Sequence, residues 1–187
     1  MNLPSREECI KLLQKYEIFP NIMEHSLVVN KIAMFLAKKL KEKQININID
    51  LIDRASLLHD IAKSNEIRSP DRKSGLLHAQ MGYDILIKEG YPEIAEIIRK
   101  HVLSAVLEES IENWTWEEKI VQYADDRIDH NKIVSLYERF KALVERYSQF
   151  EGAGKQIIKS RKYVEVIEKE IFNIIGGSPD DLLKLNK

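Results

Sequence analysis

Apolar residues recur at helical spacing along almost the whole chain, and no stretch alternates convincingly as a β-strand would. All five prolines fall where a periodic stretch starts or stops, as expected of residues that break helices. Ser5 followed by Glu8 is a capping-box signature for a first helix that extends to about Tyr16. Further helices are predicted near residues 24–42, 50–62, 78–89, 93–108, 116–130 and 132–148, with a last one between the EGAG breaker at 151–154 and Gly176-Gly177. The pattern predicts an all-α protein of one compact domain, in which the last two helices form a C-terminal extension.

Composition narrows the class of protein without naming a function. With 44% apolar and 32% charged residues among 187, the chain has the composition of a soluble globular protein with a sizeable core. Lys and Arg (29) nearly balance Asp and Glu (30), so we expect no nucleic-acid partner and no membrane partner. The single cysteine, Cys9, suits a reducing compartment, and the sequence shows neither a signal peptide nor an apolar run of membrane-spanning length. We therefore expect a cytoplasmic protein.

Four of the five histidines share a helix face with apolar residues. His25, His59, His78 and His101 each fall on the apolar stripe of a different predicted helix, whereas His130 follows a polar run and is predicted at the surface. A single inward histidine is more often a hydrogen-bonded core residue than a ligand, and a His-Asp doublet is common by chance. Four inward histidines in one small domain are harder to explain separately.

Two aspartates join these histidines on the inward faces. Asp60 follows His59 directly. Asp125 lies four residues after Val121 and three before Ile128, so it is predicted on the apolar face, whereas Asp126 is predicted on a polar face. A shared cation would satisfy buried imidazoles and carboxylates together. Mixed nitrogen and oxygen ligands suit iron, manganese or zinc, and six candidate ligands favour two metals over one.

In this order the residues resemble the ligand series of the HD-domain superfamily of metal-dependent phosphohydrolases. The segment LLHDIAK is similar to the HDIG signature, with Ala62 where that subgroup usually has glycine. The matching segments run from residue 24 to about 130 and read, in order, EHSLVVNKIA, LLHDIAK, HAQMGYDILIKEG, IIRKHV and KIVQYADD. The chain is most similar to small stand-alone HDIG proteins and also resembles the HD-type diadenosine tetraphosphate hydrolases, which use a di-iron centre.

The resemblance implies a helical bundle around two divalent metal ions. A single HD domain would cover residues 1–187, with the core motifs in 20–130 and the C-terminal helices of 131–187 packed on it. Iron or manganese would be the first choice, with zinc, nickel, cobalt or magnesium as alternatives. One metal would be held by His25, His59, Asp60 and Asp125, and the second by His78 and His101, with Asp60 as the bridge.

The resemblance also implies a reaction. A metal-bridging hydroxide would attack the phosphorus of an ester or anhydride in a nucleotide or related small molecule. Lys63 would contact the phosphate, so Asp60 and Lys63 are the predicted catalytic residues. Arg68, Arg72 and Lys73 belong to a predicted loop at 64–77 that is either a phosphate-binding lid or a solvated basic loop. Arg127 would reach a leaving phosphate or pair with a neighbouring aspartate.

Two other functions fit the same ligands. A few enzymes of this fold are mixed-valent di-iron oxygenases, and some related domains are regulatory modules without catalysis. The presence of Lys63 and the basic loop favours the phosphohydrolase, and the complete ligand series argues against a regulatory module. The C-terminal helices would close one side of the substrate pocket or form a homodimer contact.

Overall fold

Amphipathic helices make up most of the chain, and the prediction of an all-α fold is confirmed. The computed structural model describes residues 2–69 and 77–186. In chain order the elements are α1 (Arg6–Lys15), α2 (Pro20–Glu42), α3 (Ile49–Leu58), α4 (Lys63–Arg68), α5 (Leu77–Glu89), α6 (Pro92–Arg99), α7 (Ala105–Glu108), the 3₁₀ helix η1 (Ile111–Asn113), α8 (Trp116–Asp126), β1 (Ile128–Asp129), β2 (Lys132–Ile133), α9 (Leu136–Tyr147), α10 (Ala153–Ile175) and the 3₁₀ helix η2 (Pro179–Asn186).

Side-chain caps fix where several of these helices begin. The predicted capping box at the start of α1 is present: Ser5 Oγ accepts a hydrogen bond from the Glu8 amide, and Glu8 accepts one from the Ser5 amide. Equivalent boxes open α8 at Thr115 and α9 at Ser135. Proline stands in the first turn of α2 and α6, where its missing amide proton costs no helical hydrogen bond.

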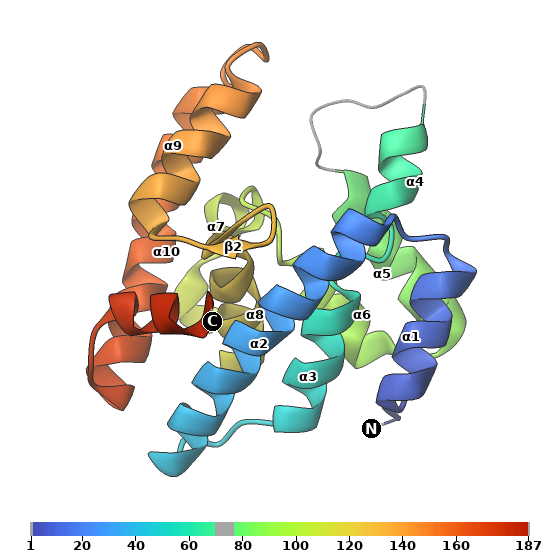
Figure 1. The fold of residues 1–187 in the computed structure, drawn as a ribbon, viewed down its shortest axis with the longest axis horizontal. Helices are drawn as coiled ribbons and strands as arrows, with labels where there is room; N and C mark the ends of the chain where they lie inside the picture. Colours follow the sequence, from blue (N-terminus) through green and yellow to red (C-terminus); the bar gives the residue numbers. More distant parts are fainter. Residues whose placement is uncertain (1, 70–76, 187) are drawn as a thin grey trace.

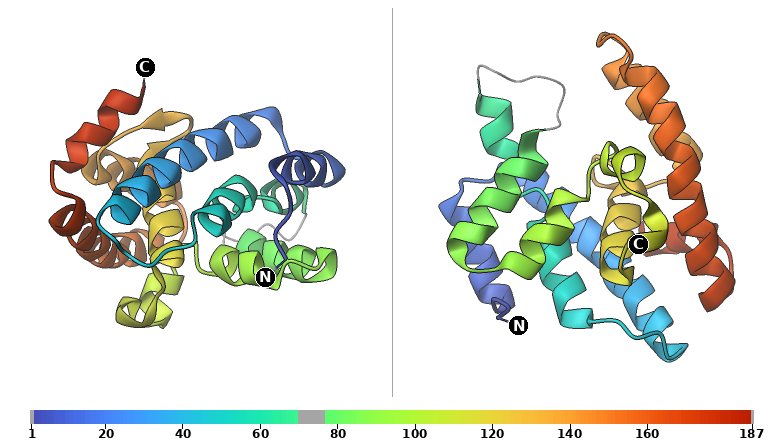
Figure 2. Two further views of the ribbon diagram at one scale, coloured as in Figure 1. Left: turned by 90° about the horizontal axis from the view of Figure 1, so that it is seen from below. Right: turned by 180° about the vertical axis from the view of Figure 1, so that it is seen from behind.

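The helices pack around two buried apolar clusters. One cluster joins α2 to α8, α9 and α10, and the other joins α1 to α3, α5 and α6. Helices α2 and α3 pack against each other where the two clusters meet. In Figure 1, α9 and α10 stand together on one side of the molecule, while α1, α4, α5 and α6 lie on the other. The views in Figure 2 show the same separation from below and from behind.

Four predicted helices are shorter than expected or interrupted, and the differences occur at three points, each near a predicted ligand. The helix expected over 50–62 ends at Leu58, because residues 59–62 form a turn that is followed by α4. The helix expected over 93–108 is interrupted by residues 100–104. The helices expected over 116–130 and 132–148 are separated by the short antiparallel hairpin of β1 and β2, in which Ile128 pairs with Ile133. Tertiary contacts override helical spacing at these points.

In the described parts of the chain, every helix is too short or too polar to cross a lipid bilayer.

Candidate metal centre

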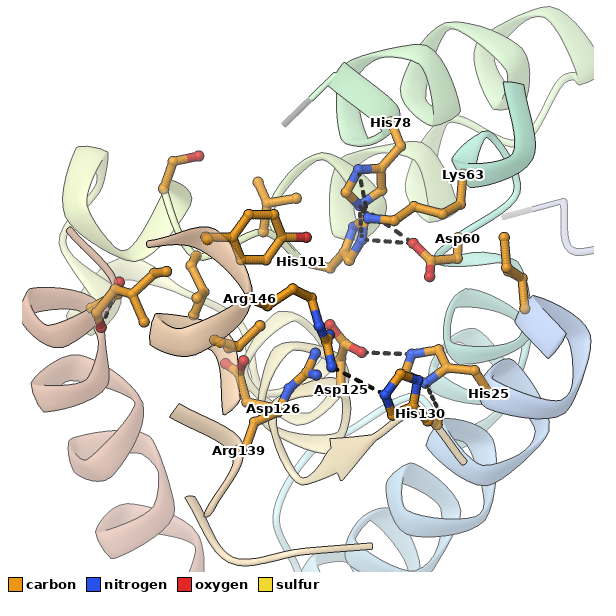
Figure 3. Close-up of a pocket in the computed structure, with 18 of the residues that line it drawn as sticks. His25, Asp60, Lys63, His78, His101, Asp125, Asp126, His130, Arg139 and Arg146 are labelled. Carbon is orange, nitrogen blue, oxygen red and sulfur yellow. Dashed lines mark hydrogen bonds and ion pairs between the residues drawn. The ribbon is translucent and has the colours of Figure 1, made fainter. Parts of the chain in front are cut away.

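The six predicted metal ligands come together at one point, although five different segments carry them. They come from α2 (His25), the turn after α3 (His59 and Asp60), α5 (His78), the segment after α6 (His101) and α8 (Asp125). Most of these residues are visible in Figure 3 around a common cavity. Two overlapping groups have potential ligand atoms within 4.8 Å of one another: His25, His59 and Asp60, and then Asp60, His78 and His101.

A turn allows the neighbours His59 and Asp60 to face the same centre. The Ile61 amide donates to the Leu58 carbonyl at 3.0 Å, and the Lys63 amide donates to the Asp60 carbonyl at 2.9 Å. These bonds span three residues instead of four, so the chain turns more tightly than an α-helix would. His59 Nε2 and Asp60 Oδ2 are therefore only 3.7 Å apart.

Each of the four histidines is held from behind through Nδ1. The acceptors are the carbonyl of His130 for His25 (2.8 Å), the carbonyl of Ser56 for His59 (2.9 Å), Oε2 of Glu66 for His78 (2.9 Å) and the carbonyl of Ile98 for His101 (2.5 Å). Because these oxygens accept, each ring carries a proton on Nδ1 and turns Nε2 toward the cluster; on His25, Nε2 also carries a proton and donates it to Asp125 Oδ1 at 2.8 Å. This is the arrangement that metal-binding histidines use.

A bound cation would satisfy the nitrogen atoms that meet at the centre. Nε2 of His78 and Nε2 of His101 are 3.0 Å apart, so two acceptors face each other unless a positive charge lies between them. Nε2 of His59 is fully buried and has no hydrogen-bond partner among the described residues. A buried polar atom without a partner costs free energy, and a bound metal would remove that cost. These donors fit divalent metal ions.

The two carboxylates are placed differently around the four rings. Asp60 Oδ1 lies 3.3 Å from His78 Nε2 and 3.6 Å from His101 Nε2, while its Oδ2 faces His59. Asp125 Oδ1 lies 2.8 Å from His25 Nε2 and 3.8 Å from His59 Nε2. Asp60 therefore faces both groups, as a bridging ligand must, and Asp125 faces one.

Electrostatics keep most of these groups in the form that binds metal. Burial lowers the pKa of His59 to about 4, and burial together with Lys63 lowers the pKa of His78. Burial opposes ionisation of Asp60, but Lys63 and the histidines hold its pKa well below the usual range. His25 differs: burial would lower its pKa, but the hydrogen bond to Asp125 raises it. A metal would therefore displace a proton mainly from His25.

Lys63 and Glu66 complete the surroundings of His78. Lys63 begins α4, lines the cavity and places Nζ 3.2 Å from His78 Nδ1 and 3.3 Å from Nε2. Glu66 is one turn further along α4 and is buried; besides His78, it accepts a hydrogen bond from the Leu77 amide. Sequence reasoning missed Glu66, because the expected loop at 64–77 is helical over its first part and turns this carboxylate inward.

The centre opens into a cavity of about 430 Å³. Besides most of the ligands and Lys63, the lining includes Asp126, His130, Arg139 and Arg146. None of these four was expected at the site. Arg146 donates to Asp129 Oδ1 at 2.8 Å. It also lies 3.3 Å from His130 Nε2 (Figure 3).

The prediction that Asp126 lies on an exposed polar face of α8 is wrong. It is buried, accepts a hydrogen bond from Gln122 at 2.7 Å, and has its pKa raised to about 7 by burial and by the neighbouring Asp125 charge. Gln122 is buried as well, because α8 packs against α2, α3, α6, α9 and α10. A helix enclosed on nearly all sides has no solvent face for periodicity to reveal.

Among the described residues predicted to bind substrate, Lys63 lines the cavity, whereas Arg68 and Arg127 do not. Arg127 is fully buried outside the cavity lining, where it pairs with Glu168 at 3.1 Å and donates to the carbonyls of Val134 and Pro179. Its expected contact with a leaving phosphate is therefore wrong. Arg68 also lies outside the lining and donates to the Glu17 carbonyl at 2.9 Å. The remaining two, Arg72 and Lys73, lie outside the described residues.

An all-α bundle whose core directs histidine and aspartate ligands into a cavity defines a metal-binding helical domain. The HD-domain family matches residues 22–143, and the chain belongs to that family. The match begins with α2 and extends into α9, so it includes all six ligands. No solved structure matches the chain.

Relatives with curated names fall into two groups. The chain is 28% identical over 178 residues to a tRNA (cytidine(56)-2'-O)-methyltransferase of Thermoplasma volcanium, covering 88% of this chain and 48% of that protein. It is 24% identical to the methyltransferase of the same name from Picrophilus torridus, over 97% of this chain and 50% of that protein. An uncharacterised protein of Methanocaldococcus jannaschii is 32% identical, over 83% of this chain and 90% of its own length. The chain thus spans about half the length of the two methyltransferases.

Proposed function

We propose that the chain is a metal-dependent phosphohydrolase that cleaves a phosphate ester or anhydride of a nucleotide or related small molecule. The observation that carries the proposal is the shared orientation of the four histidines, whose Nε2 atoms face Asp60 and Asp125 at the end of an open cavity. His25, His59, Asp60 and Asp125 would hold one metal, and Asp60, His78 and His101 a second. The bound metals would activate water and neutralise charge on the phosphoryl oxygens.

The chain supplies the rest of the chemistry from residues that line the cavity. Lys63 would bind a non-bridging phosphate oxygen, because its ammonium lies beside His78 and its side chain lines the cavity with 25% of its surface exposed. Arg146 would orient the same anion from the opposite helix, α9. Glu66 would hold the His78 ring in position through Nδ1.

We do not propose the methyltransferase activity named for the two longer relatives as a function of this chain. Their sequences are about twice as long as the part that this chain matches. We propose that the matched half carries the metal centre and that methyl transfer belongs to the other half. An assay of the present chain for methylation of tRNA tests this division, and methyl transfer by this chain would contradict it.

Metal analysis followed by a phosphate-release screen tests the phosphohydrolase. Protein stripped with a chelator and reloaded with manganese or iron should bind two ions per chain. The loaded protein should then release phosphate from at least one dinucleoside polyphosphate, mononucleotide or cyclic nucleotide. Stoichiometric metal without hydrolysis anywhere in the panel would contradict the proposal. Oxygen consumption with an organic substrate would instead favour an oxygenase.

A further inference from the structure

The cavity has a second part that metal chemistry does not explain. Beyond the ligands, its lining includes polar residues and also a group of apolar side chains from three segments: the region around α7, helix α9 with the turn after it, and helix α10. We call this part the apolar lobe and define it by Leu103, Leu107, Leu143, Tyr147, Phe150 and Ile157.

The apolar lobe is a surface of the cavity as well as part of the core. Leu143 and Ile157 are buried and anchor the lobe to the apolar cluster shared by α2, α8, α9 and α10. Leu107 and Tyr147 are only partly buried, and Phe150 is 39% exposed. Apolar side chains gathered in a concave, accessible place are typical of ligand sites.

The two aromatic rings favour a flat partner over a flexible chain. The centroids of Tyr147 and Phe150 are 6.1 Å apart and the rings are inclined by 36°, so both belong to one wall. Gln156 also lines the cavity and offers an amide donor and acceptor to the edge of a ring. A heteroaromatic ring combines a face that can stack with an edge that can form hydrogen bonds.

Charge divides the cavity in the same way. The lobe residues carry no charge, whereas Lys63 and Arg146 lie toward the metal ligands (Figure 3). A ligand that fills both parts must be anionic at one end and apolar at the other. A nucleoside phosphate has this distribution of charge.

We infer that the apolar lobe binds the base of the nucleotide while the phosphate lies against the metal centre. This inference rests on the proposed function and adds the residues that select the substrate. Tyr147 and Phe150 would contact the base, Gln156 would bind its edge, and Leu107, Leu143 and Ile157 would exclude water. The C-terminal helices would then determine which phosphate esters are accepted.

Calorimetric titration of the metal-free chain tests the lobe separately from catalysis. We expect one or more of the four common ribonucleosides to bind, and ribose alone to bind much more weakly. Tyr147→Ala should weaken nucleoside binding about 5- to 150-fold, since stacking on an aromatic side chain is worth about 1–3 kcal/mol. The matched control is Tyr137→Ala, because Tyr137 is on the same helix, is 62% exposed and lies outside the cavity lining. Equal binding of ribose and every nucleoside would overturn the inference.

Turnover by the metal-loaded protein provides the second measurement. The ratio of kcat/KM for a nucleoside 5′-monophosphate to that for ribose 5-phosphate should be large in the unmodified chain. Tyr147→Ala should lower this ratio, mainly by raising KM for the nucleoside 5′-monophosphate. A ratio near one, or preference for a simple alkyl phosphate, would overturn the base site while leaving the phosphohydrolase intact. Nucleoside binding without hydrolysis of any phosphate would support the lobe and contradict the proposed function.

Discussion

The metal centre and the apolar lobe share one cavity but are built on opposite principles. The centre consists of titratable side chains that are almost completely buried, and each histidine is fixed from behind by a hydrogen bond. The lobe consists of apolar side chains, of which Leu107, Tyr147 and Phe150 are partly exposed, and it would contact a ligand mainly by packing. Substitutions in the centre should therefore change whether chemistry occurs, and substitutions in the lobe should change which substrate is used.

Removing the shared carboxylate should break the centre most completely. Asp60 faces both ligand groups, so Asp60→Ala should abolish binding of both metals and reduce phosphate release to background. Metal content after dialysis and the phosphate-release assay check this outcome. The matched control, Asp84→Ala, removes an exposed aspartate of α5 and should retain both ions. Activity that survives Asp60→Ala would refute the metal assignment.

Arg127 connects the two regions, because it caps the C-terminal end of α8, which carries Asp125, while its partner Glu168 belongs to α10. Arg127→Met would leave two carbonyls without their buried donor and remove the only cation paired with Glu168 among the described residues, which would keep its hydrogen bond from Tyr123. It should lower the free energy of unfolding by about 3–5 kcal/mol, as expected when one partner of a buried ion pair is lost. Urea unfolding measures the change. Arg161→Met removes the exposed pair with Glu165 within α10 and should cost less than about 1 kcal/mol. Similar losses in the two variants would show that Arg127 does not connect the regions.

The same difference explains how far sequence reasoning reaches. The ligands could be predicted because buried charged residues are rare, so six of them on apolar faces already indicate one site. The lobe could not be predicted, because Leu143 and Tyr147 look like ordinary core residues of an amphipathic helix. Whether such a residue meets another helix or an open cavity depends on how α9 packs against α10.

Local geometry set a second limit on prediction. Helical spacing overestimated the helices beside His59, His101 and Asp125, because tight turns and a hairpin replace helix at those points. The sequence pattern did not indicate a role for Glu66, since its partner His78 is on another helix and the two side chains meet only in the folded protein. Arg127 was misjudged for the same reason, because Glu168 is 41 residues away. Periodicity reports which face is buried but not which atoms meet there.

Substitution of Glu66 should have a smaller effect than loss of Asp60 and should distinguish the two ligand groups of the centre. Glu66→Gln should weaken metal binding about 10- to 100-fold, because the Nδ1 proton of His78 loses its charged acceptor. The loss should affect the group of His78 and His101 more than the group of His25 and His59. Competition with a chelating dye resolves the two affinities. Glu112→Gln, at an exposed glutamate, is the control, and equal weakening of both ions would contradict a role specific to His78.

The smallest effect is expected at His130, which contacts a predicted metal ligand through its backbone only. The bond to His25 uses the His130 carbonyl, so neither His130→Ala nor His130→Asn should change metal content, and activity should stay nearly intact. The backbone of His130 has φ of 58°, a left-handed conformation that asparagine tolerates better than alanine. Alanine should therefore cost about 1 kcal/mol of unfolding free energy and asparagine close to none. Urea unfolding and metal quantification on both variants check this, and metal loss in either one would mean that the His130 side chain contributes to the centre as well.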